Sequence, residues 1–420
     1  MKITILTAGT GSYYCGACMR DNALVKGLRS LGHDAHLVPM YLPLQLDEER
    51  VDGQTPVFFG GLNVYLQQKF RLFRKLPRWV DRFFNAQGLL RALAKRSHMT
   101  SAREQGEMTY QMLCFEDSHL DKELDKLVDW LEKDGTPEVV VLSNALLVGL
   151  AKPLKARLGS SVSVACTFQG EDSFLDGLPE PWKSKAWSEM SARLYDADVV
   201  VSPSRFYSEL MKERTGVESV VIPNGVDLSG YRAGAAEGKI GYLARMCHSK
   251  GLGLLVDAFI EMNHPSAHLA IAGTMGGGDD QYVEGLKNKL EQAGLGERVQ
   301  WLPDLDREAK AQFLSELAVF CVPVQYPEAF GLYLIEAMAC GVPVVMPNAS
   351  AFPEIVEGAG CGFLVEEGSV QALAKGLEEL FDHPERRAIG EKGRIAAEDR
   401  YHVGAMAKQF EMLFKEEGSE

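Results

Sequence analysis

The sequence predicts an α/β fold made of two domains, each built on a parallel sheet. Short apolar runs alternate with segments of helical periodicity, and this alternation occurs in both halves of the chain. A strand, a helix and a second strand in close succession require parallel strands joined by a right-handed crossover. The length of 420 residues exceeds that of an ordinary single domain, so we expect two domains of about 200 residues each.

The N-terminal half opens with this strand–helix–strand pattern. Residues 3–8 form an apolar run that ends at a glycine turn, residues 18–31 have helical spacing, and residues 35–40 form a second apolar run. The glycines do not fit a dinucleotide-binding turn, because the third glycine is missing and no acidic residue ends the second strand. Further strands of this half are predicted at 139–142, 162–167 and 199–202.

A second set of strands and helices follows a turn at Asn224-Gly225, and we place the boundary between the domains near residue 218. Strands are predicted at 239–244, 268–273, 299–302, 319–322 and 343–346. A final helix is predicted over 402–417.

Residues 326–345 carry most of the predicted chemistry. They indicate a loop, a short helix capped at its C-terminus by Gly341, and a buried strand. Glu328 lies in the loop, and Glu336 lies one to two turns into the helix. Carboxylates at these two places suit a ligand rich in hydroxyl groups, because a carboxylate accepts hydrogen bonds from sugar hydroxyls.

The start of this helix is a predicted anion site. The backbone amides of Phe330, Gly331 and Leu332 would point away from the helix without a partner inside it. Such a terminus carries about half a positive charge and binds phosphate groups. The stretch therefore indicates a ligand with both phosphate and sugar parts.

With its flanking residues, this stretch resembles the E-x7-E motif of the family-4 (group 1) retaining glycosyltransferases. The matching residues are Glu-Ala-Phe-Gly from Glu328 and Glu-Ala-Met-Ala-Cys-Gly-Val-Pro-Val-Val from Glu336. The resemblance implies the GT-B fold, in which two Rossmann-like domains face each other across a cleft and the C-terminal helix crosses back to the N-terminal domain. It assigns residues 1–217, completed by a helix near 400–418, to the acceptor side and residues 218–399 to the nucleotide-sugar donor.

A second element of that family, Gly-Arg…Lys-Gly, resembles Ala244-Arg245 and Lys250-Gly251, with alanine in place of the first glycine. Arginine offers a planar fork and lysine a compact charge, and both suit a diphosphate. The resemblance implies that these two cations and the helix N-terminus stabilise the departing phosphate, so we expect no metal ion and no cofactor. It assigns the ribose to Glu336 and the donor sugar hydroxyls to Glu328, with Arg245, Lys250 and Glu328 as the catalytic residues.

Two more donor-binding positions lie in the N-terminal half. Gly16 matches the family's loop that approaches the donor diphosphate. The stretch 167–172 resembles a family pattern whose histidine lies near the reacting sugar, but Gln169 stands at the histidine position here. Glutamine can hydrogen-bond a hydroxyl or a phosphate but cannot act as an acid or base at neutral pH, so a mechanism that requires the histidine is in doubt.

The implied function is transfer of a sugar from a nucleotide-diphospho-sugar to a sugar, lipid-linked or other hydroxyl acceptor, with retention of anomeric configuration. A nucleotide-sugar epimerase of the same fold and a non-catalytic nucleotide-sugar-binding protein are the alternatives. The sequence does not identify the donor base, the sugar or the acceptor.

The charge distribution adds a prediction about partners. A net charge of −14 argues against a general nucleic-acid binder. Residues 69–96 have the opposite charge, since nine basic residues and the single acidic Asp81 give +8. Aromatic residues lie between these basic residues. Such a segment suits an anionic membrane surface or an anionic acceptor, and a solvated helical insertion is the alternative.

No run of eighteen apolar residues occurs, and the first apolar run is too short for a signal peptide. We therefore expect a cytoplasmic protein, with peripheral contact at the inner membrane face as a further option.

The eight cysteines suit a reducing compartment. Cys15 and Cys18 could form a reversible disulfide that reshapes the loop around Gly16, a thioredoxin-like redox pair, or simply two small buried residues.

Overall fold

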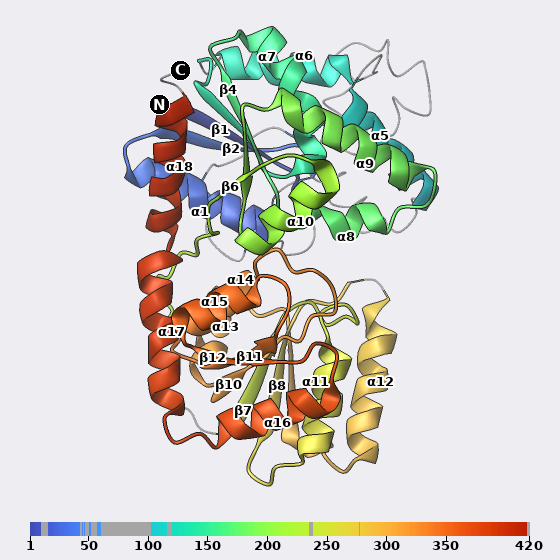
Figure 1. The fold of residues 1–420 in the computed structure, drawn as a ribbon, viewed down its shortest axis with the longest axis vertical. Coiled ribbons are helices and arrows are strands. Elements are labelled where there is room, and N and C mark those ends of the chain that lie inside the picture. Colours follow the sequence, from blue (N-terminus) through green and yellow to red (C-terminus); the bar gives the residue numbers. More distant parts are fainter. Residues whose placement is uncertain are drawn as a thin grey trace. The chain divides into compact units, whose positions relative to one another are not determined.

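The computed structural model describes residues 1–9, 16–42, 44, 46, 50–51, 57–59, 102–115, 120–133, 135–234, 238–276 and 278–417. The chain divides into two compact units (Figure 1). Unit 1 comprises Met1–Pro203, Ser208–Ile222 and Met406–Glu420. Unit 2 comprises Ser204–Tyr207 and Pro223–Ala405.

Unit 1 is built on a parallel sheet with the strand order β2-β1-β3-β4-β5-β6. Its described strands are β1 (Lys2–Thr7), β2 (Asp34–Pro39), β3 (Val139–Leu142), β4 (Ser163–Thr167), β5 (Val199–Ser202) and β6 (Val220–Val221). All four residues of β3 and of β5 are buried, because helices cover both faces of a parallel sheet. The strand order reverses between β1 and β3, as in doubly wound nucleotide-binding folds.

Helices surround this sheet. The described helices of unit 1 are α1 (Gly16–Ser30), α5 (Ala102–Cys114), α6 (Asp121–Lys133), η3 (Ala145–Leu150), α7 (Ala151–Leu158), α8 (Glu171–Asp176), α9 (Trp182–Arg193), η4 (Leu194–Asp196) and most of α10 (Arg205–Thr215). Figure 1 shows α5 and α9 side by side on one side of the sheet, and these two helices pack closely.

Unit 2 has a second parallel sheet, with the order β12-β11-β10-β7-β8-β9. Its described strands are β7 (Lys239–Leu243), β8 (His268–Gly273), β9 (Val299–Pro303), β10 (Val319–Phe320), β11 (Val344–Pro347) and β12 (Gly362–Val365). Read from β9, the sheet has the 3-2-1-4-5-6 order of Rossmann folds. The order reverses between β7 and β10, which places a ligand-binding edge at the ends of these two strands.

The helices of unit 2 connect these strands. They are α11 (Leu252–Met262), α12 (Asp279–Gln292), η5 (Gly296–Arg298), α13 (Arg307–Ser315), α14 (Leu332–Ala339), α15 (Phe352–Ala359), α16 (Val370–Phe381) and α17 (Arg386–Arg400). Helix α14 ends at Ala339, and the predicted cap residue Gly341 follows with a φ of +67°. The amide of Gly341 donates to the carbonyl of Met338 and that of Val342 to the carbonyl of Ala337, so these two carbonyls of the last turn are satisfied.

The last helix, α18 (Val403–Glu417), belongs from Met406 onward to unit 1. Its buried residues follow a helical period and form one apolar face; they are Met406, Ala407, Phe410, Leu413 and Phe414. His33, which follows α1, lies 3.1 Å from Glu411 on this helix. The C-terminal helix thus completes the N-terminal unit, as the resemblance implied.

Most predicted strands are confirmed to within a residue or two at each end. The predicted strand 319–322 is shorter, at Val319–Phe320, and the edge strands β6 and β12 were not predicted. The basic segment 69–96 and Cys15 lie outside the described residues. Among the residues that the structure describes, no helix has the length and apolar character needed to cross a membrane.

Candidate active site

Three of the predicted donor residues of unit 2 lie on the loops where the strand order of its sheet reverses. Arg245 follows β7, Lys250 precedes α11, and Glu328 lies between β10 and α14. Because β7 and β10 are neighbours in the sheet, the loops that leave their carboxyl ends lie together.

Lys250 and Glu328 form an ion pair at this edge, with 2.5 Å between Nζ and Oε2. The local backbone explains the contact. Gly251 has a φ of +73°, and a Cβ atom on it would lie 1.7 Å from the carbonyl oxygen of Pro323, so only glycine lets the two loops approach. The amide of Gln325 also donates to the carbonyl of Ser249 at 2.9 Å. The loop after β10 is therefore fastened to the loop that carries Lys250.

Two tyrosines complete the surroundings of Glu328. The hydroxyls of Tyr326 and Tyr333 each donate to Glu328 Oε2 at 2.9 Å. The Lys250 ammonium lies 4.9 Å from the centre of the Tyr326 ring and 5.2 Å from that of Tyr333. The main chain is held as well, since the amide of Glu328 donates to the Ser350 hydroxyl at 3.0 Å.

This environment keeps Glu328 ionised. Burial by itself would raise the pKa of the carboxyl, but the charge and hydrogen bond of Lys250 and the two tyrosine hydroxyls outweigh it and hold that pKa below its ordinary value. Burial, together with the charge of Glu328, raises the pKa of Tyr326 and of Tyr333 well above the usual range. Both phenols therefore stay protonated and act as donors.

Arg245 lies on the loop after β7 and pairs with Asp279, the first residue of α12. The distance from Arg245 Nε to Asp279 Oδ2 is 2.7 Å, and the same oxygen accepts from the amide of Gly276 at 2.7 Å. The Arg245 side chain is about half exposed, at 52%. A guanidinium has five N–H donors in a planar fork, a geometry that suits a phosphate.

Glu336 occupies a separate polar cluster in unit 2. Its Oε1 accepts from Lys310 Nζ at 2.6 Å and from the hydroxyl of Tyr231 at 2.7 Å. Lys310 is on α13 and Tyr231 lies between the turn at Asn224 and β7. The two glutamates of the motif thus bind different lysines.

The N-terminus of α14 supplies the predicted amide donors. Gly331 has a φ of +85° and precedes the first helical residue, Leu332. Within the described residues, the amides of Phe330, Gly331 and Leu332 donate no hydrogen bond to the protein. The Ser204 hydroxyl donates to the carbonyl of Ala329 at 2.7 Å and holds the loop just before this terminus.

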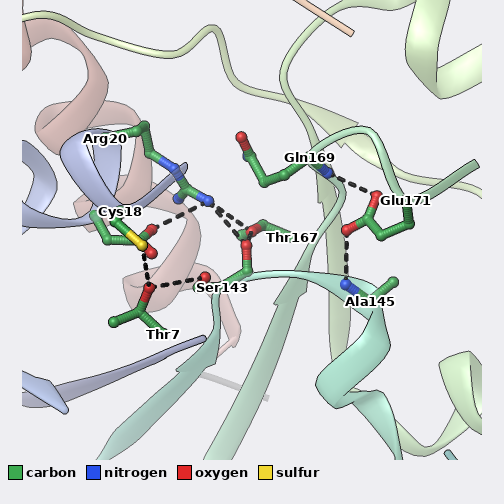
Figure 2. A network of polar contacts seen from close by, with 9 residues as sticks. Thr7, Cys18, Arg20, Ser143, Ala145, Thr167, Gln169 and Glu171 are labelled. Carbon is green, nitrogen blue, oxygen red and sulfur yellow. Dashed lines mark hydrogen bonds and ion pairs between the residues drawn. The ribbon is translucent and has the colours of Figure 1, made fainter. Parts of the chain in front are cut away.

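The remaining predicted positions belong to unit 1. Gly16 begins α1, and Gln169 follows β4. Figure 2 shows Arg20 reaching from α1 across the ends of β3 and β4, and the side chain of Gln169 extending toward the same side. Arg20 Nη2 donates to Thr167 Oγ1 at 2.8 Å and to the carbonyl of Ser143 at 3.2 Å.

The loop that carries Gln169 is held by a buried carboxylate. Glu171 accepts from the amide of Gln169 at 2.8 Å and, with its other oxygen, from the amide of Ala145 at 2.8 Å (Figure 2). Burial raises the pKa of Glu171 against the opposing effect of these amides. The carboxylate therefore fixes the loop after β4 to the loop after β3.

Cys18 is buried, and its Sγ accepts a hydrogen bond from the Thr7 hydroxyl at 3.8 Å. Because Cys15 is not among the described residues, the disulfide hypothesis stays a prediction.

Sequence reasoning found the charged residues but missed several of their partners. Tyr326 and Tyr333 stand two residues before and five after Glu328, so their proximity was a usable signal. Lys310, Tyr231 and Asp279 are distant from the motif, and no local pattern marks them. In the described part of the chain, no three His, Cys, Asp or Glu side chains are grouped as a metal site would require. The expectation of metal-independent chemistry stays a prediction.

The part of the chain that carries this site is similar to proteins of known family. Residues 232–395 match the family model described as "Glycosyl transferases group 1". The phosphatidyl-myo-inositol mannosyltransferase of Mycobacterium leprae is 26% identical over 273 residues, which cover 63% of this chain and 67% of that enzyme. The enzyme of the same name from Mycobacterium tuberculosis is 30% identical over 218 residues, and the match spans only 55% of its length.

Solved structures resemble the chain over nearly its whole length. Sucrose-phosphate synthase from Thermosynechococcus elongatus superposes with a TM-score of 0.73 at 19% identity, covering 99% of this chain and 98% of that one. The Anabaena protein Alr3699/HepE, solved in complex with UDP-glucose, has a TM-score of 0.67 at 18% identity and covers 99% and 100%. These likenesses confirm the predicted fold class, two parallel-sheet α/β domains of the GT-B type. The family model and the relatives show that the chain is similar to group 1 glycosyltransferases, with the family model matching residues 232–395.

Proposed function

We propose that this chain is a retaining glycosyltransferase that moves a sugar from a nucleotide-diphospho-sugar to a hydroxyl acceptor. The observation that carries the proposal is the Lys250–Glu328 pair at the reversal point of the unit 2 sheet, followed in the chain by the open amides of α14. One charge of each sign next to an anion-binding terminus suits a ligand with phosphates and hydroxyls.

In this proposal, the diphosphate is bound by Lys250, Arg245 and the N-terminus of α14. Lysine has three N–H donors, and the Glu328 contact uses one of them, so the others can reach a phosphate. When the bond between the sugar and the diphosphate breaks, negative charge develops on the leaving phosphate. Donors already fixed around it each contribute about 3–4 kcal/mol of transition-state stabilisation.

The two glutamates serve different parts of the donor. Oε1 of Glu328 has no hydrogen-bond partner among the described residues, and it would accept from a hydroxyl of the sugar. Oε2 of Glu336 has likewise no such partner among them, and it would accept from the ribose. Gly16 and Gln169 would contact the donor from unit 1, and the acceptor would enter on the face that the nucleotide leaves, which retains the anomeric configuration.

The relatives guide the choice of substrates to test. The mycobacterial enzymes are named as mannosyltransferases of phosphatidyl-myo-inositol, so mannosyl donors and inositol-containing acceptors belong in the panel. The proposal itself commits to a nucleotide-diphospho-sugar donor and a hydroxyl acceptor.

A thermal-shift screen tests the proposal. UDP-, GDP- and ADP-sugars are compared with the matching nucleoside diphosphates and nucleosides, since a ligand present at 100 times its Kd stabilises the folded state by about 2.7 kcal/mol. We expect one base series to raise the melting temperature, more with the diphosphates than with the nucleoside, and equally with and without EDTA. Absence of a shift in every series would contradict donor binding, and a shift that needs a divalent cation would contradict the metal-free part of the proposal.

A further inference from the structure

We propose that Tyr326 and Tyr333 are positioning residues that fix the Glu328 carboxylate by one oxygen and leave its other oxygen for the donor sugar. The proposal deepens the function proposed above and rests on it for the identity of the ligand. It concerns only side chains of unit 2.

The hydrogen bonds are distributed unequally over the carboxylate. Oε2 accepts from the Lys250 ammonium at 2.5 Å and from the two tyrosine hydroxyls at 2.9 Å each. A carboxylate oxygen has about two lone-pair sites, so three donors saturate Oε2. Oε1 has no partner among the described residues and is the oxygen that remains for a ligand hydroxyl.

The aromatic rings have a role separate from that of the hydroxyls. The Lys250 ammonium lies 4.9 Å and 5.2 Å from the two ring centres, within cation–π range. The rings therefore hold the cation, while the hydroxyls hold the carboxylate. Replacing tyrosine by phenylalanine keeps the rings and the packing and removes only the hydroxyls.

The electrostatics of the cluster give the proposal a measurable consequence. Burial opposes ionisation of Glu328, and Lys250, Tyr333 and Tyr326 together lower its pKa below the ordinary value. Tyr242 of β7 and Cys247 are further titratable groups close enough to act on Tyr326. Loss of either phenol hydroxyl should therefore raise the pKa of Glu328.

The sign of the pH dependence follows. A carboxyl whose pKa is lowered in the folded state loses its contribution as the pH falls through that lowered pKa. If ionised Glu328 is needed for transfer, the acid limb of the activity profile lies below the ordinary glutamate pKa in the wild type. That limb should move to higher pH in each phenylalanine variant.

The direct test is a carboxyl titration of the full-length protein labelled with ¹³C at glutamate Cδ. The Glu328 signal is identified by its loss in Glu328→Gln, and it is followed in Tyr326→Phe, Tyr333→Phe and the double variant. Tyr195→Phe is the control, because Tyr195 is 69% exposed and its hydroxyl donates to the carbonyl of Gly216, far in sequence from the Glu328 cluster. We expect a higher pKa in each single variant, the highest in the double variant, and no change in the control.

An activity measurement distinguishes failure of this proposal from failure of the proposed function. With a donor identified by screening, kcat/KM of each phenylalanine variant should fall about twofold to tenfold, and inhibition by the matching nucleoside diphosphate should be unchanged. A Glu328 pKa in the double variant equal to that of the wild type overturns the positioning role. A raised pKa without turnover of any nucleotide sugar supports the positioning role and contradicts the proposed function.

Discussion

Glu328 binds one lysine and two tyrosines, Glu336 binds one lysine and one tyrosine, and the two carboxylates differ in position. Glu328 lies in a loop at the reversal point of the sheet and shares Lys250 with the predicted phosphate site. Glu336 is inside α14, is 8% exposed, and binds Lys310 of α13. We therefore assign the first carboxylate to the reacting sugar and the second to the nucleoside.

The diphosphate contacts are tested by removing each cation. Arg245→Ala and Lys250→Ala should weaken binding of the nucleoside diphosphate about tenfold or more, because a hydrogen bond to a charged group contributes about 1.5–3 kcal/mol. Binding of the free nucleoside should change little. Calorimetric titration of both ligands gives the comparison. Lys287→Ala on α12 is the control, because Lys287 contacts Glu284 at 3.6 Å and the Trp301 ring at 5.7 Å and none of the predicted donor residues. If either variant lost the same affinity for the nucleoside as for the nucleoside diphosphate, that cation would not bind the phosphates.

The assignment of the ribose to Glu336 makes a separate prediction. Glu336→Gln should reduce the affinity for the nucleoside diphosphate by up to about tenfold and remove discrimination against its deoxyribose form, since one ribose hydrogen bond is lost. Competition binding with the ribose and deoxyribose diphosphates measures both effects. Unchanged discrimination in Glu336→Gln would place the ribose elsewhere.

At the scale of elements, the site depends on how closely two loops approach. The backbone of Gly251 touches the carbonyl of Pro323, and this contact places Lys250 next to Glu328. Helix α14 follows the second loop and presents its open amides after it. The geometry of the site is therefore a property of the loops between β7, α11, β10 and α14.

Gly251→Ala tests this dependence. The added Cβ would lie 1.7 Å from a carbonyl oxygen, so the backbone must shift, and the left-handed conformation adds about 1–2 kcal/mol. Gly294→Ala is the matched control: its φ is +72°, and its Cβ would meet nothing within 4 Å. We expect both variants to lower the melting temperature, and only Gly251→Ala to weaken nucleoside diphosphate binding. Equal nucleoside diphosphate affinity in the two variants would show that the Gly251–Pro323 contact does not determine the geometry of the site.

The sequence was sufficient for most of the strands and for the charged groups of the site. Buried runs such as 139–142 consist of β-branched and apolar residues bounded by turns, which is why their ends were predicted correctly. The edge strand β12 is only half-buried along its length, so it lacks such a pattern. The motif predicted both Lys250 and Glu328, but not their direct contact, which depends on the pairing of β7 with β10.

The partners of Glu336 show the same limit. Lys310 precedes it by 26 residues and Tyr231 by 105, and only the packed fold brings them together. Tyr326 and Tyr333 are close in sequence to Glu328, yet a tyrosine next to a glutamate usually has no such role. The proposed positioning role rests on the folded geometry, in which both hydroxyls donate to one oxygen of Glu328.

At the scale of the whole molecule, we predict that the segment 69–96 binds an anionic membrane surface or an anionic acceptor. Its charge of +8 contrasts with the net charge of −14. Each lysine or arginine near an anionic surface contributes about 1 kcal/mol, and salt screens this attraction. We expect the protein to sediment with phosphatidylglycerol vesicles at low salt and to be released as salt is raised, with phosphatidylcholine vesicles as the control. Equal and negligible binding to both would favour a solvated insertion.

Our main claim is that the chain transfers a sugar from a nucleotide-diphospho-sugar. It rests on the two parallel-sheet units and on the Lys250–Glu328 pair in unit 2. The most direct measurement is the nucleoside diphosphate released when wild-type protein and Glu328→Gln are incubated with UDP-, GDP- and ADP-sugars, with and without acceptor candidates. We predict release from one base series by the wild type, and a rate at least about tenfold lower for Glu328→Gln, equivalent to about 1.4 kcal/mol of transition-state stabilisation. No release from any donor, or equal release by the two proteins, would contradict the claim.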